Sequence, residues 1–265
     1  MNIIDLGIEG PQCASIEHIK KEYQKMLEPY KLRLGNMDGG LTSMPFMKGP
    51  KFTGNVYNDK AIRILFVGRA VNGWEIGFKD GTIDEIVDQV FESASNMGDI
   101  AAGVVEDQNG NQYNYNKSPF FQLCHKLMNL YGLSENWSER MAWTNLYKVA
   151  PYEKGNPNNS LIRETLSGCA SILRKEISYL RPTHIVFITD AWWYKPSGKN
   201  MDESAFIKEI GVDLYEDTSK IIVGSGIGEA FGFRPKVVIT KRPEGSKFTR
   251  ETHTKAIFDA FENLV

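Results

Sequence analysis

The sequence lacks a long hydrophobic run, an amino-terminal export signal and any large excess of charge. A membrane-spanning helix needs about 20 consecutive apolar residues, and no segment approaches that length. The first residues, MNIIDLGIEGPQ, contain neither the basic region nor the apolar core of a secretory signal. We therefore expect a cytoplasmic protein that makes no contact with a membrane.

Cysteine is scarce, with only Cys13, Cys124 and Cys169 at wide spacing. An odd number of cysteines without a Cys-x-x-Cys pair or a Cys/His cluster argues against a disulfide framework and against a zinc site. We expect buried free thiols and predict no metal and no cofactor.

Charge is nearly balanced, with 31 Lys and Arg against 33 Asp and Glu. This balance argues against a chain coated with positive charge, although nucleic-acid enzymes often confine their basic residues to one face. Basic residues do outnumber acidic ones near the C-terminus, where Lys247 and Arg250 are candidates for contacts with nucleic-acid phosphates. The alternative is a solvated face of mixed charge.

The chain of 265 residues has room for one large α/β domain. We expect that domain over residues 59–265, preceded by a helical and irregular extension over residues 1–58 that packs on it. Apolar spacings of three and four predict a helix over residues 15–30, limited in length by Pro29. Residues 35–58 show neither helical nor strand periodicity, so we predict an irregular arm there, which is a candidate lid.

Four short apolar runs have the continuous pattern of strands buried on both faces. They cover residues 62–68, 141–147, 184–189 and 236–241. Helical patterns separate them, beginning at Thr82, running from Ser118 to Gly132, and running from Ser160 to Leu180. Ser118 followed by proline, and Gly132, are the expected end signals of the second of these helices. This alternation predicts a three-layer α/β/α fold with a central parallel sheet of about four strands.

Two further features are interpreted as structural, and a third is a candidate for chemistry. The glycine-rich segment 223–232 is predicted to form a turn beside an edge strand, with nucleotide binding as the alternative. Trp143 lies inside a predicted strand and is expected in the core. Among the histidines, His253 near the last loop is the candidate for acid–base chemistry.

Ligands of a parallel sheet bind beyond the carboxyl ends of its strands, so the loops there are the places to search. They are residues 69–75, 148–151, 190–194 and 242–247. The side-chain amide of Asn145 offers both a donor and an acceptor to a polar ligand edge. Trp192 and Trp193 cannot both point inward, so one of them can stack on a ring.

The sequences of these four loops are GRAVNGW, NLYKVAP, TDAWW and KRPEGSKFTR, and LRPTHIVFI leads into the third predicted strand. Together they resemble the motifs of the uracil-DNA glycosylase superfamily, from about Ile62 to the C-terminus. Leu180, Pro182, Ile185 and Val186 carry the match to that superfamily's entry into its third strand. The resemblance implies a uracil-DNA glycosylase-like fold and a DNA-repair hydrolase that flips a base out of DNA and cleaves its N-glycosidic bond.

The resemblance also implies a site. The loop from Gly68 to Gly73 would hold the attacking water and cover the base. The residues expected to bind the base or ligand are Gly68, Arg69, Ala70, Val71, Gly73, Trp74, Asn145, Lys148, Trp192, Lys241 and Pro243. For the hydrolysis itself, Asn72 or Glu75 would orient water, and Arg242 or Lys241 would stabilise the departing base.

The first and last motifs depart from the superfamily pattern at Arg69, Val71 and Arg242. These occupy the places where relatives commonly have a carboxylate or amide, a proline and a histidine. Arginine does not give up its proton at neutral pH, so it cannot act as a base, but a pair of arginines suits a phosphate or carboxylate. Alternatively, Arg69 is a surface residue paired with a carboxylate, and residues 72–73 form an ordinary helix-entry turn.

Three functions follow as hypotheses. The first is a DNA or nucleobase glycosylase, probed by cleavage of strands that contain uracil, hypoxanthine or xanthine. The second is a protein of the same fold that binds nucleic acid or an anionic ligand without catalysis. The third is an enzyme that acts on a free nucleotide. The expected partner is thus DNA, a nucleobase or a nucleotide, and the expected oligomeric state is a monomer.

Overall fold

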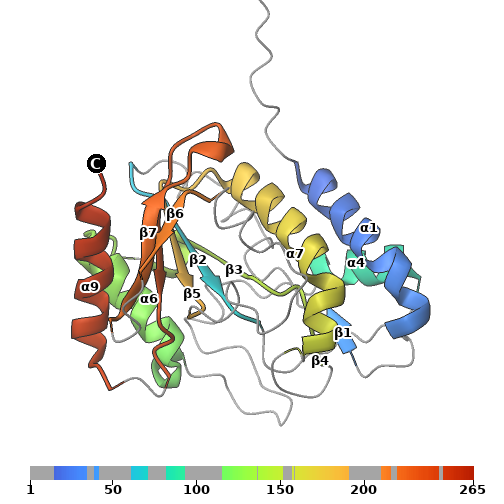
Figure 1. Ribbon diagram of the computed structural model, residues 1–265, viewed down its shortest axis with the longest axis horizontal. Coiled ribbons are helices and arrows are strands. Elements are labelled where there is room, and N and C mark those ends of the chain that lie inside the picture. The colour runs from blue at the N-terminus through green and yellow to red at the C-terminus, as the bar shows by residue number, and fades with distance from the viewer. Residues whose placement is uncertain are drawn as a thin grey trace, which may run out of the picture.

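The computed structural model describes residues 15–34, 39–41, 61–70, 82–92, 115–135, 137–151, 157, 159–190, 210–215, 220–244 and 247–265. In these ranges the chain forms an α/β fold in which helices cover both faces of a six-stranded mixed sheet (Figure 1). A separate two-stranded antiparallel ladder joins β1 (Gly39–Leu41) to β4 (Val149–Pro151).

The four predicted strands are confirmed and lie side by side in parallel. They are β2 (Ile64–Gly68), β3 (Met141–Asn145), β5 (His184–Ile188) and β8 (Lys236–Thr240). All residues of β2 and β5 are buried, as their continuous apolar runs predicted. The full strand order is β3-β2-β5-β8-β7-β6.

The expectation of an all-parallel sheet of about four strands was therefore incomplete. Strands β7 (Ile222–Ile227) and β6 (Val212–Leu214) extend the sheet beyond β8, and both pair antiparallel to their neighbours. The interpretation of residues 223–232 as a turn was wrong for their first half, which is β7. Glycine fits there because a Cβ on Gly226 would collide with the carbonyl oxygen of Gly211.

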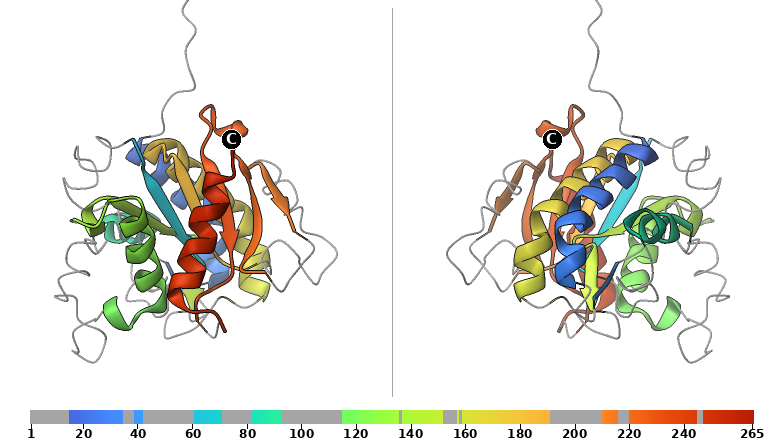
Figure 2. Two further views of the ribbon diagram at one scale, coloured as in Figure 1. Left: turned by 90° about the vertical axis from the view of Figure 1, so that its left-hand side faces the viewer. Right: turned by 90° about the vertical axis from the view of Figure 1, so that its right-hand side faces the viewer.

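Two pairs of helices cover the sheet. Helices α6 (Pro119–Leu130) and α9 (Arg250–Glu262) pack together on one face, and α1 (Ile16–Leu34) and α7 (Asn159–Leu180) pack together on the other (Figure 2). Helix α4 (Ile83–Glu92) packs against α1. Single 3-10 turns form at Tyr115–Lys117, Trp137–Glu139 and Glu229–Phe231.

Local signals explain how some helices begin and end. Ser118 accepts a hydrogen bond from the backbone N–H of Phe121 at 3.4 Å, and Gly132 adopts a φ of 68° after the last turn of α6, so both predicted end signals are confirmed. Helix α9 was not predicted. Thr249 caps it by accepting from the backbone N–H of Thr252 at 3.2 Å.

The N-terminal segment differs from its prediction in two ways. Helix α1 continues through Pro29 to Leu34, although proline was expected to limit it. Burial of Tyr23 and Leu27 against the protein supplies packing that outweighs the lost hydrogen bond. Residues 39–41, expected to be irregular, form β1, because backbone pairing with β4 needs no apolar period. The proposed lid lies otherwise outside the described residues.

Two other expectations concern the whole chain. Cys124 and Cys169 are buried free thiols, as predicted, and Cys13 lies outside the described residues. None of the described helices is long and apolar enough to cross a membrane.

Candidate functional site

The candidate site lies at the carboxyl ends of the parallel strands. The chain runs from β2 to its neighbour β3, and then returns past β2 to form β5 on its other side. The strand order thus reverses at β2, and ligands of open α/β sheets bind outside the carboxyl ends at such a reversal. Gly68 is the last residue of β2, so the loop that the sequence singled out begins at this place.

Gly68 and Asn145 lie against each other at the ends of β2 and β3. They are partners in the strand register, and the side-chain oxygen Oδ1 of Asn145 is 2.6 Å from the point where a Cβ of residue 68 would lie. Pairing continues past the strands, because the N–H of Leu146 donates to the carbonyl of Gly68 at 2.8 Å and that of Tyr147 donates to Arg69 at 2.9 Å. Glycine at position 68 therefore leaves the space that the amide of Asn145 occupies.

Two buried donors at this place lack partners within the described residues. Asn145 is 3% exposed, and its Nδ2 has no hydrogen-bond partner among them. The same holds for Nε1 of Trp143, which lies 3.3 Å from the Cβ point of Gly68. An unsatisfied buried donor costs about 1–3 kcal/mol, and a ligand acceptor would remove that cost. Trp143 was expected to be a core residue, and its ring does pack on Phe121 at 5.1 Å, yet its N–H faces the site.

Phe120 is a site residue that the sequence did not reveal. It lies in the first turn of α6, is partly exposed, and places its Cε2 3.5 Å from the Cβ point of Gly68. The adjacent Phe121 is 4% exposed and turns into the core. Two consecutive phenylalanines on a helix cannot share one face, and this was the available signal.

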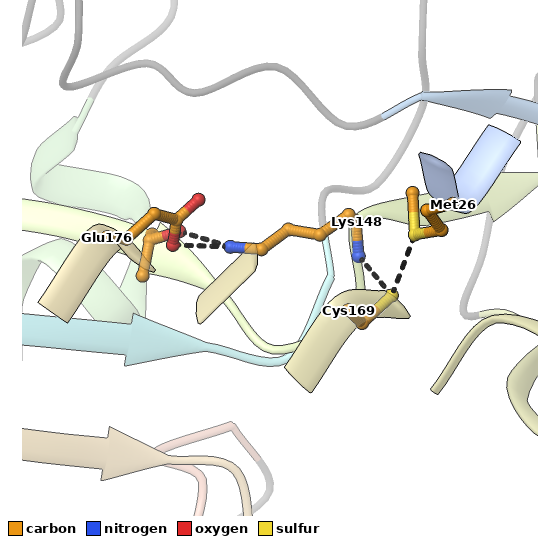
Figure 3. Close-up of polar contacts among 5 residues, drawn as sticks. Met26, Lys148, Cys169 and Glu176 are labelled. Carbon is orange, nitrogen blue, oxygen red and sulfur yellow. Dashed lines mark hydrogen bonds and ion pairs between the residues drawn. The ribbon is translucent and has the colours of Figure 1, made fainter. Parts of the chain in front are cut away.

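Lys148 was predicted to bind the ligand, but the structure places its ammonium elsewhere (Figure 3). Its Nζ lies 2.6 Å from Oε2 of Glu176 and donates to Oγ1 of Thr144 at 2.7 Å, on the α7 face of the sheet. Burial lowers the pKa of Lys148 and raises that of Glu176, and the ion pair opposes both shifts. Thr144 and Asn145 point to opposite faces because strand side chains alternate. Lys148 is therefore no longer a candidate for ligand contact.

Cys169 lies beside this ion pair. Its Sγ accepts from the backbone N–H of Lys148 at 3.3 Å and is 3.8 Å from Sδ of Met26 in α1. Burial raises the pKa of this thiol. Among the residues described, no group of three or more His, Cys, Asp or Glu side chains is placed to hold a metal ion.

Charged side chains gather where β2, β5 and β8 end. Burial, and after it the positive charge of Arg242, lowers the pKa of Arg69 to about 10, while Tyr147, Asp190 and Glu244 oppose the shift. The charge of Arg242 therefore reaches Arg69, although β5 separates β2 from β8 in the sheet. Nε of Arg242 donates to Oε2 of Glu244 at 3.2 Å.

Two hydrogen bonds hold the last loop, which follows β8. Nη1 of Arg250 donates to the carbonyl of Pro243 at 2.8 Å, and the N–H of Lys241 donates to the carbonyl of Ile221 at 2.9 Å. Pro243 is buried, whereas Lys247 is exposed. Arg250, predicted to contact phosphate, thus holds the loop in place, and Lys247 keeps the exposure that a phosphate contact needs.

His253 was the candidate for acid–base chemistry, but it is fully buried in α9. Its Nε2 lies 2.7 Å from the hydroxyl of Thr240, which donates to the carbonyl of Ile221 at 3.1 Å. Burial lowers the pKa of His253 to about 4. Through this contact His253 stabilises the end of β8. The geometry does not support the role in proton transfer that the sequence suggested.

Buried histidines make stability depend on pH. The pKa values of His253 and His184 are lowered from 6.5 to about 4, so the unfolded chain binds protons that the folded chain does not. Their contribution to stability is complete above about pH 6.5 and is lost as pH falls toward 4. We expect the urea midpoint to fall between pH 7 and pH 5, and His253→Gln to reduce that dependence. The control His18→Gln, at an exposed position, should leave that pH dependence unchanged. If the urea midpoint of His253→Gln depends on pH as strongly as that of wild type, His253 is not a source of the pH dependence.

The described part of the chain thus brings together four site residues, and part of the predicted set lies outside it. Gly68, Asn145, Trp143 and Phe120 meet at one point, and partly buried Ala70 follows close behind. The predicted residues that lie outside the described ranges are Val71, Asn72, Gly73, Trp74, Glu75, Trp192 and Trp193.

A comparison with models of known protein families finds no match, and none of the curated proteins matches this sequence.

Proposed function

We propose that the chain binds a nucleobase, flipped out of DNA or free, at the carboxyl edge of the sheet, and hydrolyses the N-glycosidic bond that joins a flipped base to its sugar. One observation carries the proposal. Asn145 is buried beside Gly68, and its Nδ2 has no partner among the described residues. A polar group in that state suits a ligand that supplies the missing acceptor.

The surrounding groups suit a nucleobase. A base edge alternates acceptors with donors, and the Asn145 amide supplies one of each, with the indole N–H of Trp143 as a further donor. Phe120 presents an aromatic ring beside the same point, and stacking a base on such a ring contributes about 1–3 kcal/mol. This combination of an amide and a ring is what a flipped base requires.

Hydrolysis is supported by the charges around the site and by the resemblance to the uracil-DNA glycosylase superfamily. Cleavage leaves negative charge on the base, which cationic groups stabilise. Arg242 and Lys241 follow β8 directly, and Arg69 follows β2. These cations lie at the same edge of the sheet as Asn145.

A second candidate function is the binding of an anionic ligand without turnover. It is favoured by the mutual effect of Arg69 and Arg242, since two guanidinium groups that repel each other would both be stabilised by a phosphate between them. Such binding would weaken steeply as salt concentration rises.

The proposal is tested by incubating excess protein with single-stranded oligonucleotides that contain uracil, hypoxanthine or xanthine. We expect release of at least one of these bases and tighter binding than to the unmodified strand. Asn145→Ala is expected to weaken binding and slow release by about 10- to 100-fold, the equivalent of one buried hydrogen bond to the ligand. Asn129→Ala, at an exposed position on α6, is the matched control and should behave as wild type.

The outcomes separate the two candidates. Salt-sensitive binding that does not discriminate between the modified and unmodified strands, without release of any base, would favour the anionic ligand. Equal, weak binding of all strands at low salt, again without release, would contradict both candidates. Normal activity of Asn145→Ala would contradict the assigned base contact.

A further inference from the structure

Asp190 follows β5 and has an unusual backbone. Its φ is 63°, a left-handed value that few residues other than glycine adopt, although aspartate and asparagine tolerate it best. Its N–H donates to the carbonyl of Thr240 at 3.1 Å, which ties this turn to the end of β8. A strained residue that is held in this way frequently belongs to a functional site.

The sheet places Asp190 across β2 from Asn145. Val67 pairs with Phe187, and continuing that register sets Gly68 opposite Ile188, two residues before Asp190. On the other side of β2, Gly68 pairs with Asn145. Two strand spacings, about 10 Å, separate Asn145 from Ile188 across the sheet, and Asp190 lies two residues beyond Ile188. A pyrimidine bound to Asn145, its glycosidic carbon and one water molecule fit within such a span.

The carboxylate of Asp190 is available for chemistry. Asp190 is half-buried, and within the described ranges no hydrogen bond to its carboxylate is present. It lies close enough to Arg69 to influence that guanidinium. Glu244, a second carboxylate among the described residues at this edge of the sheet, is exposed and is paired with Arg242 at 3.2 Å.

We infer that Asp190 is the catalytic carboxylate of the hydrolysis, which orients the attacking water and stabilises the positive charge that develops on the sugar. This inference rests on the proposed function. The water oxygen forms a bond to the anomeric carbon, and the carbon–nitrogen bond breaks with its electron pair leaving on the base. Asp190 accepts the proton of the water and passes it to solvent, and the departing base takes up a proton from solvent.

This assignment accounts for the arginine in the first loop. The resemblance implies a carboxylate or amide near the position of Arg69, and an arginine there cannot accept a proton. Asp190 supplies the acceptor from the neighbouring strand. Arg69 follows β2, which lies between β5 and β3 in the sheet, and its positive charge would offset the negative charge on the departing base.

The inference is tested with two variants that remove the carboxylate differently. Asp190→Asn keeps the shape and the tolerance of a left-handed backbone, and Asp190→Gly relieves the strain, so each is expected to fold. Asp213→Asn, at an exposed position in β6, is the control. With excess protein and oligonucleotides that contain uracil, hypoxanthine or xanthine, we expect both Asp190 variants to release base at least 100-fold more slowly than wild type. Their Kd for the same strands should stay within threefold, and the control should match wild type.

Each outcome decides one question. If wild type releases a base and either Asp190 variant releases it at the wild-type rate, the inference is wrong and the proposed function stands. Loss of binding in both variants would also overturn it, because Asp190 would then be a binding residue. If wild type binds the modified strands but releases no base, both the hydrolysis and the role of Asp190 fall, while base recognition stands.

Discussion

Replacing Lys148 with methionine is expected to lower the free energy of unfolding by about 3–5 kcal/mol, the usual cost of removing one member of a buried ion pair. Lys148 is 1% exposed and Glu176 is fully buried, with 2.6 Å between Nζ and Oε2. The substitution leaves the carboxylate without its counter-ion, and Oε1 of Glu176 has no partner among the described residues even with lysine present. Urea denaturation at pH 7 measures the loss.

The double variant Lys148→Met, Glu176→Leu is the control for this prediction. Two apolar side chains of similar volume remove both charges, so most of the lost stability should return. The stability lost relative to wild type should also be smaller at pH 5 than at pH 8, because burial raises the pKa of Glu176 and protonation removes the uncompensated charge. A loss below about 1 kcal/mol in the single variant, or additive losses in the double variant, would contradict a coupled buried pair.

Gly68→Ala is expected to weaken nucleobase binding at least tenfold and to lower the free energy of unfolding by about 1–3 kcal/mol, the usual cost of overpacking. The added Cβ would lie 2.6 Å from Oδ1 of Asn145 and 3.3 Å from Nε1 of Trp143. The first distance is too short for a real contact, so the amide of Asn145 must move away from its proposed binding position. Binding of the modified oligonucleotides and urea denaturation measure the two effects.

A double-mutant cycle identifies the cause. In Gly68→Ala, Asn145→Ala the collision is absent, so the stability losses of the two single variants should not add, with a coupling of about 0.5–3 kcal/mol. Strictly additive losses would show that Gly68 acts through something other than the space taken by Asn145. Because both outcomes concern stability alone, this test remains valid even if a nucleobase proves to be the wrong ligand.

Much of the fold could be predicted because its signals are local. The four parallel strands are continuous apolar runs, and such runs have few structures available except a strand covered on both faces. The capped α6 was likewise visible in Ser118 and Gly132. The elements that were missed depend on distant partners. Gly226 in β7 leaves room for the chain at Gly211 and Val212, where β6 begins, and β1 exists only because β4 pairs with it.

The sequence by itself indicated where the candidate site lies, because the carboxyl ends of parallel strands converge and Gly68 and Asn145 end two of them. The tertiary structure decided which side chains lie at that place. Lys148 is only three residues after Asn145, yet its ammonium lies on the α7 face with Glu176. Phe120 and Asp190 reach the same edge from another helix and another strand. Such proximity depends on register and on packing between segments far apart in the chain, and no local pattern of residues encodes either.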